Sequence, residues 1–530
     1  MCLISETCPR CGYRSSGSNT EAGATVSPTL EEDIASIMNE AHKIDDLLFQ
    51  LRNKRARLQR RLNALQSHTK MLPYEIVSTV FRHVCSRVDI HTRGVNEERA
   101  LRQPYESQSI SLEGSRSLTP VILGSVSALW REIAWSTPDL WTSFALEIKE
   151  RKIHHQASLL LLYFQNSGNL PVSLELDFQG HFSGLHYSKG VKSNGDTLAL
   201  IHAVILEHAP KVQSLRLSAV PPEWAASLNG VFTSLENLAL GWPTNGQVKP
   251  TQVLSFADIL ALRRLTIWRL WAPLKLPWSQ IVVLDLDRMT IDTCVELLIE
   301  CSNLEEYSVR EPSFTPSDRR HPSLNGIITL KSLQVLIWTC LPDAWSIAML
   351  EHVRFAKLER LEWHGFPGDQ NRNRFRDFFS DMPPTLQTLG FSRYDSPEGL
   401  QDILINIPQV TNLELLSCRS RFCRSILHSL TPPLSLESHD QVILPLLRRL
   451  TFDHCDEMHQ FGTKGSLLFR DLFSMLHLRF SAALTDQNGL LLQFRPRIKW
   501  RSDAQHMLAQ LVHEGVVMNI LEGSTAVSWV

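Results

Sequence analysis

The sequence has no long hydrophobic run, no excess of either charge and few cysteines. Its most apolar stretches, SLLLLYF at 158–164 and LALIHAVIL at 198–206, fall well short of the ~18–20 residues that a membrane-spanning helix needs. Lys and Arg number 53 against 55 Asp and Glu, which gives no reason to expect nucleic acid or a membrane as partner. The start of the chain lacks the basic segment and following apolar core of a signal peptide, so we expect none. Because its ten cysteines are mostly scattered, we expect a reducing compartment, cytoplasmic or nuclear.

Common signatures of catalysis are also missing. The chain has no G-x-G-x-x-G, P-loop, H-E-x-x-H or G-x-S-x-G motif, and no His or carboxylate pair stands out by its spacing. Three possible metal ligands, His454, Cys455 and His459, follow a predicted strand in a segment of turn-like composition. We expect a structural or solvent role for them. The sequence therefore predicts no enzyme and no cofactor, and an enzyme with a metal at these three residues is the weakest alternative.

The first segment, 1–28, is rich in Ser, Gly, Thr and Asn, which is typical of a loose tail. It contains one Cys-x-x-Cys, Cys8 and Cys11, with Cys2 nearby. Tetrahedral zinc needs four ligands, usually two such pairs. We interpret these residues as free cysteines, with zinc shared between two copies as the alternative.

A heptad pattern follows over 29–68. Thr29 and Glu32 have the spacing of a capping box. The basic run at 52–61 lies outside the seam apart from Arg55, so we interpret it as a solvated helix face rather than a nucleic-acid patch. The pattern predicts a coiled-coil helix that, through 30–66, pairs with a second copy or another protein, or folds back on the next segment. The a positions are Ile34, Ala41, Leu48, Arg55 and Leu62, and the d positions are Ile37, Ile44, Leu51, Leu58 and Leu65.

Two short amphipathic segments come next. LPYEIVSTVFRHV at 72–84 begins with Leu72 and Pro73, and a proline fits the first turn of a helix. Its apolar residues recur at spacings of three and four, as they do in PVILGSVSALWREIAW at 120–135. Helices this short cannot bury their apolar faces alone, so they must pack on each other and on something else.

Together these segments resemble an F-box of the form common among fungal F-box proteins. The resemblance covers about 40 residues, from Leu-Pro-x-Glu-Ile at 72–76 to Trp-Arg-x-Ile-Ala at 130–134 and Thr-Pro-x-Leu-Trp at 137–141. It departs from the family at Ser127, where cysteine is frequent, and at 88–119, an unpatterned polar stretch that we interpret as an exposed insertion. The resemblance implies docking to a Skp-type adaptor and through it to a cullin. The positions that it implies for adaptor binding are Leu72, Pro73, Ile76, Val80, Val126 and Trp130.

The long remainder repeats the pattern L-x-x-L-x-L, with other apolar residues allowed at the L positions. Ten copies begin at residues 212, 235, 262, 281, 304, 333, 358, 386, 410 and 447. Helix-like stretches such as TCVELLIECS at 293–302 lie between them, and PVSLELDF at 171–178 is a degenerate copy. This rhythm is typical of leucine-rich repeats, which stack into a solenoid. The segments from 466 to 521 read as helix–strand units that cap the core.

Side chains alternate along a strand, so the residues between the leucines should line the concave face of such a solenoid. Trp338 and Trp363 occupy leucine positions and are assigned to the core. Trp268 is our best anchor for a ligand, because aromatic residues dominate binding hot spots; packing on Trp271 or on an adjacent strand is the alternative. The predicted substrate-facing residues are Arg216, Arg264, Trp268, Asp285, Asp287, Arg310, Arg360, Glu362 and His364.

The predicted fold is therefore α/β, with a long helix and a small all-α F-box before an irregular leucine-rich-repeat solenoid that has parallel strands on its concave face and helices outside. The predicted domains are the tail 1–28, the helix 29–68, the F-box 69–145 with its insertion, and the solenoid 146–530 with its cap. The resemblance implies a substrate receptor of a Skp–cullin–F-box ubiquitin ligase that binds an unknown protein substrate. A coiled-coil and repeat scaffold without ligase function is the alternative, favoured by the insertion.

Overall fold

A computed structural model describes most of the chain, which divides into two compact units, Met1–Val77 and Ser78–Val530. Each unit is described by itself. The described residues are 28–66, 72–85, 119–149, 152–178, 195–218, 230–241, 253–269, 274–315, 326–394, 397–432, 442–455, 466–480, 489–495, 500–514, 516–523 and 525–527, with single residues 220, 224, 228, 324 and 498. The tail cysteines Cys2, Cys8 and Cys11, the residue His459, Trp271 and the predicted insertion at 88–119, apart from its last residue Thr119, lie outside these ranges.

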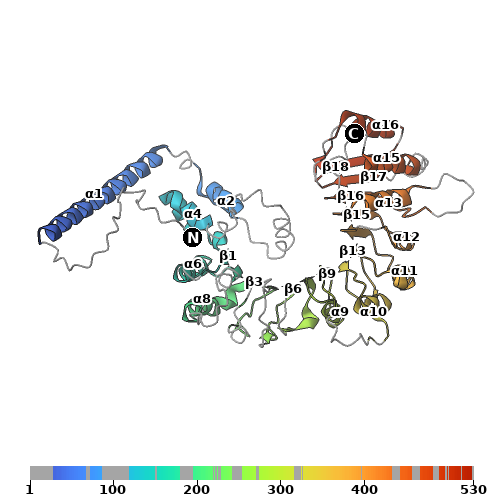
Figure 1. Cartoon of the computed structure of the whole chain (residues 1–530), viewed down its shortest axis with the longest axis horizontal. Coiled ribbons are helices and arrows are strands. Elements are labelled where there is room, and N and C mark those ends of the chain that lie inside the picture. Colours follow the sequence, from blue (N-terminus) through green and yellow to red (C-terminus); the bar gives the residue numbers. More distant parts are fainter. Residues whose placement is uncertain are drawn as a thin grey trace, which may run out of the picture. The chain divides into compact units, whose positions relative to one another are not determined.

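One long helix, α1 (Pro28–Gln66), accounts for most of what is described in the first unit (Figure 1). Its 39 residues span about 57 Å at 1.5 Å per residue. The helix covers nearly the whole segment in which the heptad pattern predicts one. Of its apolar seam residues, Leu48, Leu51 and Leu58 are among those that are exposed. Among the described residues, no helix is long and apolar enough to cross a membrane.

Three short helices carry the two amphipathic segments. Helix α2 (Tyr74–Val84) crosses the division between the units, and α4 (Thr119–Val126) and α5 (Ala128–Trp135) belong to the second unit. Ser127 caps α5, because its Oγ accepts a hydrogen bond from the Trp130 amide at 3.1 Å. A 3-10 turn, Pro138–Trp141, then leads directly into the first strand of a large sheet.

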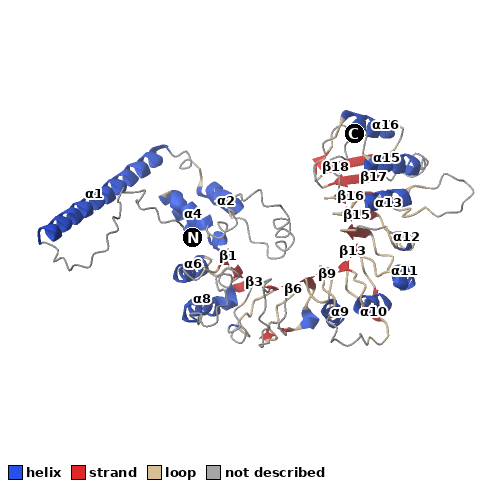
Figure 2. Cartoon of the chain, viewed as in Figure 1, coloured by secondary structure: helices blue, strands red, loops and turns tan. Residues whose placement is uncertain are grey.

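Within the described residues, the second unit is built on a sheet of fifteen strands. Every neighbouring pair is parallel except the last, where β19 turns back antiparallel on β18. Within this unit the strands lie along the inner side of a curved array and the helices along its outer side (Figure 2). The strands, in sheet order, are β1 (Ser143–Glu147), β2 (Val172–Asp177), β3 (Val212–Ser218), β4 (Asn237–Gly241), β6 (Arg264–Trp268), β8 (Val283–Asp287), β9 (Glu306–Arg310), β11 (Val335–Thr339), β13 (Arg360–His364), β14 (Thr388–Ser392), β15 (Asn412–Leu416), β16 (Arg449–Asp453), β17 (Leu490–Phe494), β18 (Met518–Glu522) and β19 (Thr525–Ala526).

Helices or loops return the chain from one strand to the next. Two small parallel pairs lie outside the main sheet: β5 (Leu254–Ser255) with β7 (Leu274–Lys275), and β10 (Ile328–Leu330) with β12 (Val353–Phe355). The α-helices of the array are α6 (Ile153–Asn166), α8 (Gly195–His208), α9 (Ile291–Glu300), α10 (Ala344–His352), α11 (Arg372–Ser380), α12 (Leu400–Leu404), α13 (Ser420–Leu430), α15 (Leu467–Phe480) and α16 (Ser502–His513).

All ten segments with the leucine pattern form strands; nine begin at the third residue of the pattern, and β3 begins at the first, Val212. The leading apolar residue, such as Leu262, is buried just before the strand. The next amide then donates to the equivalent carbonyl one repeat earlier, as Arg263 N does to Glu236 O at 2.9 Å. This ladder fixes the stacking distance of the repeats. Trp338 and Trp363 are fully buried, as their leucine positions predict.

Candidate protein-docking surfaces

The apolar residues of helix α2 lie along two edges of the helix, one buried and one exposed. The carbonyl of Pro73 starts the helix by accepting from the amides of Ile76 and Val77 at 3.1 and 3.3 Å. Val77 and Phe81 are buried, whereas Ile76 and Val80 are 50% and 49% exposed. Val84 continues the exposed edge one turn further on. The sequence predicts a single apolar stripe here; the structure uses half of it for packing and leaves half uncovered.

Helix α4 has the same division. Leu123 is buried, whereas Ile122 and Val126 are exposed. Gly124 lets the ring of Trp135 approach α4, because a Cβ at Gly124 would lie 2.3 Å from that ring. Of the residues implied for adaptor binding, Leu72, Pro73, Ile76, Val80 and Val126 are exposed and Trp130 is half-buried.

Trp130 is half-buried because it packs edge-on against Phe81, with ring centroids 5.0 Å apart. Its position therefore connects α5 to α2 within the second unit. Thr137 supports the same junction, since its hydroxyl donates to the carbonyl of Ile133 at 2.7 Å and lies 3.4 Å from that of Ser78. The motif residue Trp141 is fully buried and donates to the carbonyl of Ala134 at 2.8 Å. These side chains join the short helices firmly to the start of the sheet.

The second candidate surface, which we call the strand-side face, follows one row of paired residues across the sheet. All nine residues predicted to face a substrate lie in this row or two positions away from it, and only Arg216 among them is buried. The row runs through Glu175, Arg216, Ala239, Thr266, Asp285, Ser308, Ile337, Glu362, Gly390, Glu414, Thr451 and Gln493.

At the β2 end of this face, Trp268 lies across two neighbouring strands. Its ring covers Gly241, where a Cβ would come within 1.6 Å of it, and lies 4.5 Å from the Arg216 guanidinium carbon. This cation–π contact explains why Arg216 is only 4% exposed. Arg216 is also 3.6 Å from the carboxylate of Glu175. The expectation that Arg216 is open to a ligand is therefore wrong. The Trp268 ring is half-buried and packs on the Arg216 guanidinium.

Near the middle of the face, charged side chains pair across strands. Arg310 lies 3.6 Å from Asp285 on the neighbouring strand. Arg264, at the start of β6, is exposed, and Asp287, at the end of β8, is half-buried. These residues lie on the predicted face, and their charges alternate in sign along it.

At the carboxyl edge of the sheet, residues that follow strands form a row that sequence reasoning missed. Six non-glycine residues directly after a strand have φ between 44° and 55°. This left-handed turn lets Arg288 N donate to Arg310 O at 2.9 Å, which extends the ladder by one residue. Glu311 pairs with Arg288 at 3.0 Å and also with Arg393, which reaches it from three strands away. The six residues are Arg269, Arg288, Glu311, Arg393, Ser417 and His454.

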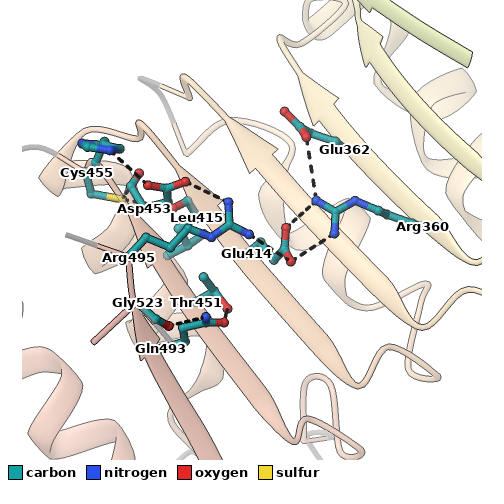
Figure 3. Close-up of polar contacts among 11 residues, drawn as sticks. Arg360, Glu362, Glu414, Leu415, Thr451, Asp453, Cys455, Gln493, Arg495 and Gly523 are labelled. Atoms are coloured by element: carbon teal, nitrogen blue, oxygen red, sulfur yellow. Dashed lines mark hydrogen bonds and ion pairs between the residues drawn. The ribbon is translucent and has the colours of Figure 1, made fainter. Parts of the chain in front are cut away.

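Towards the C-terminus the polar contacts form a continuous network (Figure 3). Arg360 donates to both carboxylate oxygens of Glu414, at 3.1 and 2.6 Å, across the side-chain-free position Gly390. Arg495 lies 3.9 Å from Glu414 and 2.9 Å from Asp453. Arg360, predicted to face a substrate, is thus held by a partner within the chain.

Glu362 is the unusual member of this network. Burial raises the pKa of its carboxyl, against the opposing effects of Arg360, Arg310 and a hydrogen bond from Ser392. Arg360 is 4.0 Å away and is already engaged by Glu414, so it compensates the charge of Glu362 only weakly. The face therefore holds a carboxyl group whose ionisation is less favourable in the folded chain than in water.

Two histidines named in the sequence analysis, His364 and His454, have contacts within the chain. The ring of His364 hydrogen-bonds through Nδ1 to the carbonyl of Ser392. His454 occupies one of the left-handed turns, 3.5 Å from the Asp453 carboxylate, and the buried Cys455 thiol donates to the carbonyl of Leu415 at 3.3 Å. Within the described ranges, no group of three or more His, Cys, Asp or Glu side chains is arranged to hold a metal ion.

In comparisons with known proteins, no family model and no curated protein matches the chain.

Proposed function

We propose that this protein is the substrate-recognition subunit of a Skp–cullin–F-box ubiquitin ligase, with an F-box that docks a Skp-type adaptor and an irregular leucine-rich-repeat solenoid that binds a protein substrate. The proposal begins from the F-box resemblance of 72–141. It is supported by the position of that segment directly before a long parallel sheet, which provides a separate surface for a second protein.

The observation that carries the docking proposal is the division of apolar side chains on α2 and α4. Val80, Val84, Ile122 and Val126 are exposed on helices that bury Val77, Phe81 and Leu123 on their other side. A helix this short gains most of its stability from covering its apolar face. Leaving half of that face in water favours a partner that covers it.

On the substrate side, the strand-side face offers a rigid, mixed-charge surface. Cross-strand pairs such as Arg360–Glu414 hold their side chains in place before a ligand arrives, which lowers the entropy lost on binding. Trp268 is the aromatic anchor in this proposal. The protein itself then performs no chemistry: it raises the local concentration of substrate lysines near a ubiquitin-charged enzyme.

The test is co-purification of the full chain with a Skp-type adaptor. A Val80→Glu/Val126→Glu variant places charges on the exposed edges and spares the buried Phe81, so it should fold normally. We expect the parent to bind and the variant to lose at least tenfold in affinity. Leu260→Glu is the matched control, because it places the same charge at an exposed apolar residue outside α2 and α4, and it should bind like the parent.

Two results would overturn the docking proposal: no binding by a parent with native circular dichroism, or equal binding by the double variant. Either result would favour a coiled-coil and repeat scaffold without ligase function, since α1 and the sheet would remain as interaction elements.

A further inference from the structure

Helix α1 exposes an apolar seam over five heptads. The seam residues Ile37, Ile44, Leu51 and Leu58 are 57–67% exposed. A 39-residue helix with such a seam is marginal alone in water, because tertiary packing normally supplies most of a helix's stability. The charges of the helix itself indicate what covers it.

The two halves of α1 carry opposite charges. The half before residue 51 holds six acidic residues, Glu31, Glu32, Asp33, Glu40, Asp45 and Asp46, against one lysine, Lys43. The half after it holds no acidic residue and six basic ones, Arg52, Lys54, Arg55, Arg57, Arg60 and Arg61. A second copy laid in the opposite direction would therefore place an acidic half against a basic half along the whole helix.

A parallel pair in register is disfavoured by two specific contacts. Arg55 occupies an a position, where parallel helices bring the same residue of both copies face to face. Two guanidinium groups would then meet in the seam. The g and e positions would also bring Glu40 of one copy beside Asp45 of the other, a like-charge contact.

An antiparallel pair resolves both contacts in one register. Each a residue then faces a d residue: Leu48 meets Leu51 of the partner subunit, and Leu62 meets Ile37 of the partner subunit. In the same register Asp45 lies beside Arg52 of the partner subunit, and Glu40 beside Arg61 of the partner subunit. Arg55 faces Ile44 of the partner subunit instead of a second arginine.

We propose that the protein self-associates through an antiparallel α1–α1 coiled coil in this register. The opposite charges of the two halves of α1 favour the antiparallel direction, and Arg55 disfavours the parallel alternative. At 1.5 Å per residue, the two Gln66 positions lie about 50 Å apart along the coiled-coil axis. The dimer thus presents two copies of everything that follows α1 from opposite ends of one rod.

Disulfide trapping tests the direction. Full-length Ile37→Cys and Leu62→Cys chains, carrying tags of different size, are co-expressed and mildly oxidised. We expect a cross-link only between the two different chains, since identical positions lie about 38 Å apart in the antiparallel register. The parent chain provides the background from its own cysteines. Cross-links within Ile37→Cys alone or within Leu62→Cys alone would overturn the proposal.

A charge exchange tests the register. Asp45→Lys and Arg52→Glu should each weaken dimerisation several-fold, and the double variant should restore it, because both facing pairs become Lys–Glu. Asp46→Lys makes the same charge change at an outer position and should have little effect. Sedimentation equilibrium of the full chain measures each constant. A monomeric parent, or a double variant no tighter than its singles, would overturn the proposal.

Discussion

Regularly spaced leucines are buried in the sheet and exposed on helix α1. In the sheet, Leu361, Leu389 and Leu413 are fully buried between neighbouring strands and the outer helices. In α1, Leu48, Leu51 and Leu58 have equally regular spacing and are exposed. Periodicity therefore identifies which side chains need an apolar neighbour. It does not tell whether the same chain provides that neighbour, and helix α2, with one buried and one exposed edge, lies between the two cases.

The sharpest test of this contrast is the same substitution in both regions. Leu389→Ala removes a fully buried side chain from a central strand and should cost about 3 kcal/mol of unfolding free energy. Leu51→Ala should leave unfolding of the sheet unchanged and weaken only self-association, since alanine favours helix and the Leu51 side chain is exposed within the described part of the chain. Denaturant unfolding followed by hydrogen exchange in β13–β15 distinguishes these results.

Because stacked repeats can unfold in parts, the local exchange of β14 is the decisive readout for Leu389→Ala. A loss of sheet protection in Leu51→Ala as large as that in Leu389→Ala would remove the distinction between the two regions.

A second test concerns Arg479, a buried charged side chain that hydrogen-bonds to backbone carbonyls. Arg479, on α15, donates to the carbonyls of Leu430 and Ile443 at 3.1 and 2.8 Å, and also to that of Leu444. Burial lowers the pKa of this guanidinium to about 10. Arg479→Met keeps much of the side-chain volume but leaves these carbonyls unpaired, so we expect a loss of about 2 kcal/mol.

Thermal unfolding measures that loss, and Arg470→Met, at an exposed position of the same helix, is its control. Equal melting temperatures for the two variants would mean that water satisfies the carbonyls in place of Arg479.

Two glycines of the strand-side face allow a smaller comparison. A Cβ at Gly241 would overlap the Trp268 ring, whereas a Cβ at Gly390 would meet Glu362 at 3.4 Å. Gly241→Ala should therefore displace Trp268 from Arg216 and cost about 1 kcal/mol. Gly390→Ala should be neutral or slightly stabilising, because alanine loses less backbone entropy in a strand. Chemical unfolding of both variants checks this, and equal midpoints would show that Trp268 does not need its place over Gly241.

The sequence predicts the sheet well, because each strand carries its own local signal. All ten patterned segments are strands, and the degenerate copy at 171–178 contains β2. Strand β1 was not predicted, because it follows the end of the F-box resemblance at Trp141, crosses the predicted boundary between residues 145 and 146, and carries no copy of the leucine pattern. The pairs β5–β7 and β10–β12 are too short to carry a pattern.

The candidate surfaces were harder to predict, because their contacts join residues far apart in the chain. Alternation along strands placed Arg360 and Glu362 on the correct face. It could not show that Arg360 is engaged by Glu414, 54 residues later, or that Trp268 covers Arg216. The left-handed residues from Arg269 to His454 share one position that the sequence shows, since each directly follows a strand. Their residue types do not reveal the conformation, because glycine, which favours positive φ, occupies only one of these described turns in the middle of the array, at Gly365.

The smallest expected effect concerns Glu362, where burial outweighs two nearby arginines. Its carboxyl has a higher pKa in the folded chain than in the unfolded one. The ionised form is therefore less favourable in the folded state, so the penalty is present above the folded pKa and disappears as pH falls below the unfolded value. Glu362→Gln should stabilise the protein at neutral pH, and this gain should shrink on acidification. Unfolding midpoints measured from pH 7.5 downward test it beside Glu306→Gln, an exposed control on β9; a variant less stable than the parent at neutral pH would mean that the ion pair with Arg360 outweighs burial.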